Sequence, residues 1–472
     1  MLNLSDFKSA ERVFHFFEEI SKIPHGSANT AKIADYLVDF ATERKLYVRR
    51  DAANNVIIRK PATKDYEDRP TVIFQGHTDM VIAKQPELDK DMECEGLDLY
   101  VDGDFLRARG TTLGGDDGVA VAYALAVLDS EDIPHPEFEA IFTSDEEIGL
   151  LGAVALDTSD IRGKTMINID SDSEGILTVG CAGGVRIDIK VPMRVTNSKE
   201  KATLIKVSGL AGGHSGIEIN NGRENAIKIL GEVLSEIAKR YNGLAVYGIR
   251  GGNADNAIPR SAECLINRAV DDDILSATVA KYKRVEPDIS ITAESAADSF
   301  FYSAEDTGNL ISLINEEPCG VIAMSKDISG LVETSLNLGI IESECDFASL
   351  AFSLRSAKGA EKDNLATRVT KIVEKHGATH FSHGAYPAWE YRKESHLRDV
   401  MCEVYRKMYG KDARVITIHA GLECGIFSDK IDGLDCVSIG PDNYDIHTTE
   451  ERLSISSTVR VWEYLKEVLK SI

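Results

Sequence analysis

The chain has 472 residues, more than the roughly 250 to 300 at which a single hydrophobic core stops growing, so two or more domains are expected. With 43% hydrophobic and 28% charged residues, the composition is that of a globular protein and excludes a disordered or fibrous chain. The formal net charge of -24 argues against nucleic acid and anionic membrane surfaces as partners.

Helical and strand patterns alternate in the first part of the chain. Apolar residues recur at helical spacing in 8–22 and 30–45, and short β-branched runs follow at 71–74, 140–143 and 166–169. Each of these runs ends in polar or acidic residues. The alternation predicts an α/β domain with a mostly parallel sheet, in which ligands gather beyond the carboxyl ends of the strands.

The pattern then changes to amphipathic strands, each followed later by a helix such as 223–239, which indicates a second domain of α+β type. Long helices such as 394–408 return near the end of the chain. We therefore predict a discontinuous catalytic domain made of residues 1–184 and 384–472. Residues 185–383 form an inserted domain in this interpretation.

The cellular compartment is indicated by the cysteines and by the lack of targeting signals. The eight cysteines are scattered and include no C-x-x-C pair, which is typical of reduced thiols. Nothing near Met1 resembles a secretory signal, and the longest strongly apolar run, 118–128, is too short to cross a bilayer. We expect a cytoplasmic protein without a membrane partner.

The first candidate site residues are His77 and Asp79, which follow the strand predicted at 71–74. Side chains alternate along a strand, so both lie on one face, and Asp79 can accept the ring N–H of a metal-bound His77. Alone, the H-x-D pattern is weak, because a histidine hydrogen-bonded locally at a strand end is a more common explanation.

Acidic residues follow at three further element ends. Asp116 and Asp117 lie in a Gly-rich turn before an apolar helix, where two buried acids require a cation or hydrogen-bond donors. Asp117 can be a helix cap, and Asp116 is the candidate bridging ligand. The adjacent Glu146 and Glu147 diverge, so one can bind a metal while the other faces a water, although an exposed acidic loop is the alternative. Asp170 closes an apolar strand and should have a partner.

A second histidine in a comparable setting is His447, which precedes the closing helix, although a role beside a helix cap is the alternative. The candidates together supply two imidazoles and three carboxylates. That inventory suits a dinuclear site with one bridging carboxylate and two further ligands for each metal. Imidazole and carboxylate ligands favour zinc, with manganese or cobalt as substitutes.

Eight motifs occur in order along the chain: GHTDM (76–80), GGDDG (114–118), SDEEIG (144–149), NIDSD (168–172), GGHSG (212–216), NAIPR (256–260), HAGLECG (419–425) and the late His447. They resemble the M20 metallopeptidases, and within them the peptidase D type, the aminoacyl-histidine (Xaa-His) dipeptidases. The resemblance extends over essentially the whole chain. It implies a zinc-peptidase catalytic domain with an inserted lid that also forms dimers.

The resemblance implies two divalent metal ions, and the ligand types described above favour zinc. One metal would be bound by His77 and Asp170, the other by Glu147 and His447, and Asp116 would bridge them.

Further roles follow from the same resemblance. Asp79 would orient the first histidine ligand, and Glu146 would be the general base. The groups that would contact the substrate are His214, Asn256 and Arg355 in the inserted domain and the backbone of Gly421. The histidine at position 214 is expected to act in the site of the other subunit of a homodimer.

We therefore expect a metal-dependent dipeptidase, of Xaa-His type or of broad specificity, acting on small peptides through a metal-activated water. A deacylase or a tripeptidase on the same scaffold is the alternative, because these enzymes share the metal site. A metal-binding scaffold without activity would have lost a ligand or the base, and this chain retains Glu146 and all five ligands.

Overall fold

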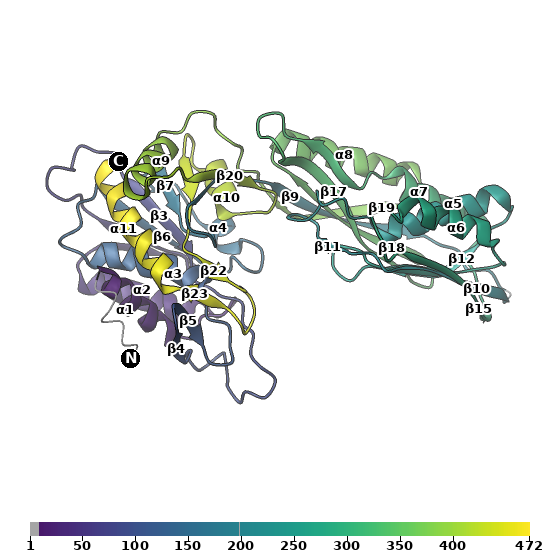
Figure 1. Cartoon of the computed structure of the whole chain (residues 1–472), viewed down its shortest axis with the longest axis horizontal. Helices are drawn as coiled ribbons and strands as arrows, with labels where there is room; N and C mark the ends of the chain where they lie inside the picture. The colour runs from purple at the N-terminus through teal and green to yellow at the C-terminus, as the bar shows by residue number, and fades with distance from the viewer. Residues whose placement is uncertain (1–8, 198) are drawn as a thin grey trace. The chain divides into compact units, whose positions relative to one another are not determined.

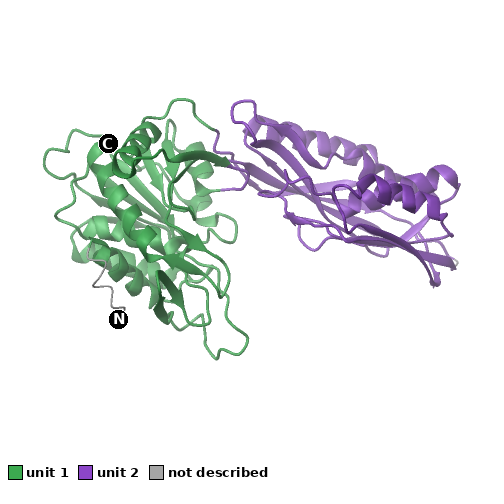
Figure 2. Ribbon diagram, viewed as in Figure 1, with its two compact units in different colours: residues 1–180, 391–417, 422–472 green, residues 181–390, 418–421 purple. Residues whose placement is uncertain are grey.

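The chain forms two units, each with its own hydrophobic core, and the computed structural model describes residues 9–197 and 199–472 (Figure 1). Unit 1 contains the described residues up to 180 together with 391–417 and 422–472 (Figure 2). Unit 2 contains residues 181–390 and 418–421. The insertion expected at 185–383 lies within unit 2, which extends further on both sides.

Main-chain hydrogen bonds explain where the crossings between the units lie. The N–H of Cys181 donates to the carbonyl of Trp389 (3.0 Å), and the N–H of Trp389 donates to the carbonyl of Cys181 (3.1 Å). The N–H of Ala182 donates to the carbonyl of Ile418 (3.2 Å). These bonds hold both connections and the short segment 418–421 to unit 2, whereas the sequence patterns placed the boundaries at 184 and 384.

Unit 1 is built on an eight-stranded sheet. In sheet order its strands are β1 (Tyr47–Arg50), β2 (Val56–Lys60), β6 (Phe138–Thr143), β3 (Val72–His77), β7 (Thr165–Asn168), β21 (Asp435–Ser438), β8 (Ile176–Cys181) and β20 (Arg414–Ile418). The four strands from β6 to β21 are parallel, whereas β1, β2 and β8 pair antiparallel. The expected parallel arrangement thus holds for the centre of the sheet, and the whole sheet is mixed.

Helices and a smaller sheet complete unit 1. The helices are α1 (Glu11–Ser21), α2 (Ala31–Glu43), α3 (Gly115–Asp129), α4 (Leu151–Ala155), α9 (His396–Tyr409), α10 (Glu423–Lys430) and α11 (Ile455–Ser471). The smaller sheet has the order β22 (Asn443–Tyr444), β23 (Arg452–Ser454), β5 (Phe105–Ala108) and β4 (Leu99–Asp102). Helix α3 is apolar around its circumference and is buried along nearly its whole length, as such a pattern requires.

The central parallel strands bring the candidate residues to one edge of the sheet. Strand β3 ends at His77, β6 ends at Thr143 just before the acidic loop, and β7 ends two residues before Asp170. Helix α3 approaches this edge closely because position 76 is glycine. A Cβ at Gly76 would lie 2.4 Å from the Cβ of Ala120 on the helix.

Unit 2 is an α+β sandwich of one large sheet and four helices among the described residues. The path of the nine-stranded sheet is β15 (Ser290–Ser299), β10 (Glu200–Ser208), β14 (Ala262–Ile266), β12 (Val246–Gly251), β17 (Val332–Ser343), β18 (Phe347–Ser356), β9 (Gly183–Pro192) and β19 (Thr379–Tyr386), with β16 (Gly320–Met324) also pairing with β17. The helices are α5 (Ala226–Arg240), α6 (Asp272–Tyr282), α7 (Ala304–Glu316) and α8 (Gly359–Lys375). Side chains of β9 alternate between buried and exposed, so helices cover only one face of the sheet.

A two-stranded element of unit 2 pairs β11 (Gly213–His214) with β13 (Ala257–Ile258). The candidate substrate residue His214 lies in β11, and Asn256 directly precedes β13.

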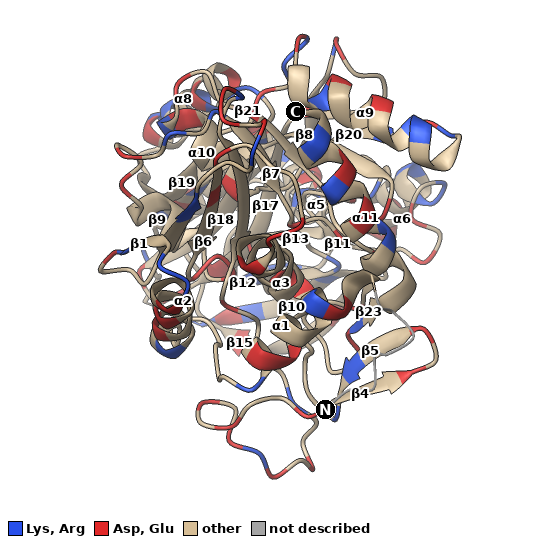
Figure 3. Ribbon diagram, turned by 90° about the vertical axis from the view of Figure 1, so that its left-hand side faces the viewer, with Lys and Arg blue, Asp and Glu red and all other residues tan. Residues whose placement is uncertain are grey.

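On the surface helices of unit 1, acidic and basic residues are interspersed, as α9 and α11 show in Figure 3. No helix of the described residues is both long and apolar enough to span a membrane.

Candidate metal centre and active site

The side chain of Asp116 lies between the two histidines that the sequence singles out. Its Oδ1 is 3.0 Å from Nε2 of His77, and its Oδ2 is 3.3 Å from Nε2 of His447. The same nitrogen of His447 is 2.9 Å from Oε1 of Glu147. One carboxylate therefore presents each of its oxygens to a different imidazole, which is the arrangement expected of a bridging ligand.

Ligand atoms gather in two groups that share Asp116. His77, Asp116 and Asp170 form one group and Asp116, Glu147 and His447 the other, with the ligand atoms of each group all within 4.8 Å of one another. Oδ2 of Asp170 is buried and has no hydrogen-bond partner among the described residues. Such an atom is costly without a cation, and imidazole and carboxylate donors suit divalent metals, so the residues present fit a metal centre.

A third group of close ligand atoms consists of His77, Glu146 and Glu147. Glu146 thus lies beside both predicted metal groups without being needed to complete either of them. This placement leaves its carboxylate available for proton transfer.

Asp79 supports the site in a different way from the one its spacing predicts. The ring Nδ1 of His77 is 2.9 Å from the main-chain oxygen of Asp79 and 3.5 Å from its carboxylate. The carboxylate accepts the main-chain N–H groups of Glu146 (2.9 Å) and Glu147 (3.3 Å) and the hydroxyl of Ser27 (2.8 Å). Asp79 therefore orients the histidine mainly through its backbone and holds the acidic loop through its side chain.

Burial and charge perturb the proton affinities at the centre. Burial opposes the charged form of His77, but the nearby carboxylates of Asp116 and Asp79 outweigh it and raise the pKa of His77 above its ordinary value. Hydrogen bonds with Asp116 and Glu147 raise the pKa of His447 to about 10. Burial raises the pKa of Asp170, and it raises the pKa of Glu146 to about 8. The protein without a metal thus retains protons on this cluster near neutral pH.

One fully buried acid of the site was not among the sequence predictions. Oε2 of Glu423 accepts hydrogen bonds from Nε2 of Gln75 (2.5 Å) and from the hydroxyl of Thr143 (2.7 Å). Burial raises the pKa of Glu423 to about 7, and His77 acts against this rise through its charge. The HAGLECG motif contains this residue, so its position in the motif was the available signal.

In unit 2, the ring orientation of His214 is set by the main chain. Its Nδ1 accepts the N–H groups of Gly216 and Ile217, both at 3.1 Å. A nitrogen that accepts two hydrogen bonds carries no proton, so the ring proton of neutral His214 is on Nε2. Burial, followed by the charge of Arg355, lowers the pKa of His214, which favours this neutral form.

The loop around His214 is fixed on both sides. The N–H of His214 donates to the carboxylate of Glu218 (2.8 Å), and the N–H of Ser215 donates to the main-chain oxygen of Asn256 (2.8 Å). Asn256 and His214 are thus brought together by the β11–β13 pair.

The other two candidate substrate residues lie beside an aromatic ring of unit 2. A terminal nitrogen of Arg355 donates to the hydroxyl of Tyr386 (3.2 Å), and Nε of Arg355 is buried without a partner among the described residues. A Cβ at Gly421 would lie 2.8 Å from the same ring. His419 is also buried here and contacts the hydroxyl of Ser335 through Nε2 (2.7 Å). Sequence reasoning did not single out Tyr386 or His419.

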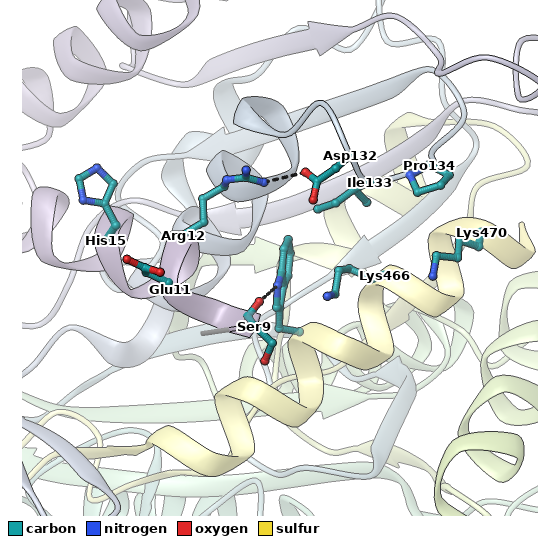
Figure 4. Close-up of a pocket in the computed structure, with 10 residues that line it drawn as sticks. Ser9, Glu11, Arg12, His15, Asp132, Ile133, Pro134, Lys466 and Lys470 are labelled. Atoms are coloured by element: carbon teal, nitrogen blue, oxygen red, sulfur yellow. Dashed lines mark hydrogen bonds and ion pairs between the residues drawn. The ribbon is translucent and has the colours of Figure 1, made fainter. Parts of the chain in front are cut away.

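A separate hollow of about 560 Å³ on unit 1 is lined by residues of α1, α11 and the 132–134 loop (Figure 4). Its cationic side chains are paired: Arg12 with Asp132 (3.3 Å, Figure 4), Lys466 with Glu463 (2.9 Å) and Lys470 with Glu467 (2.5 Å). The described residues that line it include none of the candidate site residues. The hollow is therefore separate from the cluster of candidate site residues at the sheet edge.

Comparison with known proteins shows which family the chain is similar to. The family described as peptidase family M20/M25/M40 matches residues 73–471. A cytosol non-specific dipeptidase of Escherichia coli K12 is 34% identical, and the match covers 98% of each chain. The crystal structure of an aminoacylhistidine dipeptidase from Vibrio alginolyticus superposes with a TM-score of 0.90 at 33% identity, covering 99% of each chain. A tripeptidase from Staphylococcus aureus shares the fold, with a TM-score of 0.58 at 18% identity over 98% of this chain and 97% of that one.

The buried acids predict how the stability of the metal-free protein depends on pH. Glu146, Glu423 and Asp172 have pKa values raised to about 8, about 7 and about 7, with burial as the first cause, so the folded chain holds protons that the unfolded chain has lost. Stability falls with rising pH when the folded state binds more protons. We expect the Tm of chelator-treated protein to fall as the pH is raised from about 6.5 to about 8. The range starts near pH 6.5 because ordinary histidines lose most of their charge above this pH.

Thermal denaturation followed by circular dichroism across this range measures the effect, with Glu423→Gln as the matched variant. A glutamine has no proton to lose, so the decrease should be smaller in that variant. A Tm that rises with pH in the metal-free wild-type protein would contradict the proposed protonation of the cluster.

Proposed function

The chain belongs to peptidase family M20/M25/M40, and on this premise we propose that it is a dipeptidase that hydrolyses the peptide bond of dipeptides with two divalent metal ions. The observation that carries the proposal is the position of Asp116, whose two oxygens face the imidazoles of His77 and His447. The names of the Escherichia coli and Vibrio alginolyticus relatives support dipeptide substrates. The former name also supports a cytosolic location.

The proposed ligands are His77 and Asp170 for one metal, Glu147 and His447 for the other, and Asp116 for both. Their donor types favour zinc, with manganese or cobalt as substitutes. When bound, the two cations supply Lewis acidity to the peptide carbonyl and to the attacking water. The protein contributes ligand positions, proton transfer and substrate orientation.

Glu146 is the proposed general base. It accepts a proton from the water as the water oxygen bonds to the peptide carbon, and it passes that proton to the leaving amine as the C–N bond breaks. Its main-chain N–H is held by Asp79, which fixes the start of the acidic loop. Burial raises the pKa of Glu146 to about 8 in the metal-free protein. The positive charge of bound cations would lower this pKa, so that the carboxylate would be ionised and able to accept the proton.

The candidate substrate residues of unit 2 bind and orient the dipeptide in this proposal. His214 in its neutral form offers Nε2–H to the carbonyl oxygen, on which negative charge develops. Arg355 has a buried Nε without a partner among the described residues, so its planar guanidinium is available for the terminal carboxylate of the substrate. Recognition of that carboxylate would favour substrates with a free carboxyl terminus, as dipeptides have.

A panel of substrates tests the proposed function. Metal-loaded protein should hydrolyse dipeptides faster than tripeptides or N-acyl amino acids, and a chelator should abolish the activity until zinc, manganese or cobalt is restored. The measurement is kcat/KM for each substrate class on one protein preparation. Faster hydrolysis of N-acyl amino acids or of tripeptides would replace the dipeptidase proposal with a deacylase or a tripeptidase.

Two isosteric variants separate the base from the bridging ligand. Glu146→Gln should keep two metals per chain and lower kcat by about 100-fold or more, because a base acts in the transition state. Asp116→Asn should instead lose metal, because it removes a ligand from both groups. Metal content by mass spectrometry and kcat on the same samples decide the question. Metal retained in the Asp116 variant and absent from the Glu146 variant would mean that the roles are reversed.

We further propose a homodimer joined through unit 2, the lid in this interpretation, in which His214 acts in the site of the other subunit. The resemblance to lid-dimerising peptidases supports this proposal. So does the exposed edge of the large sheet: most side chains of β19 are exposed, including Phe381, and unpaired edge strands readily associate. Near His214, the side chain of Ile217 is 73% exposed.

Complementation tests the dimer proposal. Inactive His214→Ala subunits are mixed with inactive Glu146→Gln subunits, exchange is verified by size and mass, and activity is measured. Heterodimers should regain about half of the activity per site, because one of their two sites combines an intact glutamate with an intact histidine from the other subunit. Verified exchange without recovered activity would show that His214 does not act across subunits.

A further inference from the structure

Glu451 is a buried acid that none of the proposed catalytic steps uses. It directly precedes β23 and is 3% exposed. Its Oε2 accepts the N–H groups of Leu113 (2.7 Å) and Gly114 (3.1 Å). Its Oε1 accepts the N–H of Gly115 (2.8 Å) and has a longer contact with the N–H of Asp116 (3.4 Å). One carboxylate thus contacts four consecutive main-chain N–H groups.

The turn that carries Asp116 depends on this carboxylate for its hydrogen bonds. Helix α3 starts after Gly114 without a side-chain cap, and N–H groups at a buried helix start are costly when they lack acceptors. The glycines make the contact possible: a Cβ at Gly115 would lie 3.2 Å from Oε1 of Glu451. The side-chain amide of Asn443 donates to the same oxygen (3.4 Å).

Glu451 also belongs to the segment that carries His447. The N–H of Glu451 donates to the carbonyl of Thr448 (3.2 Å), which closes the turn after the histidine. Its side-chain bonds therefore join two segments that lie 335 to 338 residues apart in the sequence. One segment supplies Asp116 to the metal centre and the other supplies His447.

A second acid so close to Asp116 is electrostatically unfavourable unless donors compensate for it. Four main-chain N–H groups and one side-chain amide donate to the Glu451 carboxylate and compensate for its charge. The same hydrogen bonds connect the segment of Asp116 to the segment of His447.

We propose that Glu451 is a positioning residue of the metal centre, which fixes the backbone of Asp116 relative to His447 without contacting metal or substrate. The inference rests on the metal centre of the proposed function. It predicts that Glu451 controls metal affinity and ligand geometry, whereas a cap needed only for folding would affect stability alone.

Glu451→Gln tests the inference, because the amide keeps the shape but places an NH₂ group against N–H donors. Glu450→Gln is the matched control: the neighbouring side chain is 66% exposed and contacts only Arg107 among the described residues. Apoprotein is titrated with Zn²⁺ in a calorimeter, and the visible absorption spectrum of Co²⁺-loaded protein reports ligand geometry. The Glu451 variant should bind Zn²⁺ about 10- to 100-fold more weakly, as expected when a residue supporting a ligand is lost, and its Co²⁺ spectrum should change.

For a dipeptide substrate, the same variant loaded with excess metal should show a lower kcat with little change in KM, since Glu451 does not contact the substrate. The Glu450 variant should match the wild-type protein in all these measurements. If Glu451→Gln does not fold, Asn443→Ala is tested in its place. Loss of the contact between Asn443 and Glu451 should also weaken Zn²⁺ binding, by a smaller factor.

This inference is wrong if the folded Glu451 variant binds Zn²⁺ as tightly as the wild-type protein and its Co²⁺ spectrum is unchanged, even if its Tm falls. If the Glu451 variant does not fold, the same result for the Asn443 variant would overturn the inference. Wild-type protein that binds no Zn²⁺ would overturn the proposed function, and this inference with it.

Discussion

Several buried carboxylates lie around Asp116, and the surrounding chain must counteract their mutual repulsion. Two like charges about 4 Å apart repel by about 4 kcal/mol at an effective dielectric constant near 20, and several acids meet here. Protonation or bound cations can relieve this repulsion. Burial raises the pKa values of Asp170 and Glu146, which favours their protonation. His77 and His447 lie beside the carboxylates at positions where they can help to bind cations.

The surrounding chain is arranged to hold these acids in place against their repulsion. Two carboxylates outside the proposed ligand set accept main-chain N–H groups from the segments that carry ligands. Asp79 accepts those of Glu146 and Glu147, and Glu451 accepts those of the turn before Asp116. Because the main chain is held, the side chains on it start from fixed positions, which is what preorganised metal binding requires. Unit 2 uses main-chain donors similarly to select one tautomer of its histidine.

Local sequence patterns predicted the strands that carry several of the candidate residues. Strand β3 ends at His77 and β7 ends two residues before Asp170, close to where the apolar runs indicate. The contacts of Glu451 and Glu423 leave no such periodic pattern, since each joins residues hundreds of positions apart. The same reason explains why the return of 418–421 to unit 2 was not predicted: it depends on hydrogen bonding between distant main-chain segments.

We propose that the carboxylate of Asp116 is shared by two metal ions at the carboxyl edge of the parallel strands. Anomalous X-ray diffraction from crystals of zinc-loaded protein tests this sharing. The account predicts two zinc peaks in unit 1, one on each side of the Asp116 carboxylate. One peak should be ligated by His77 and Asp170 and the other by Glu147 and His447. A single peak, or two ions of which neither contacts Asp116, would contradict the account.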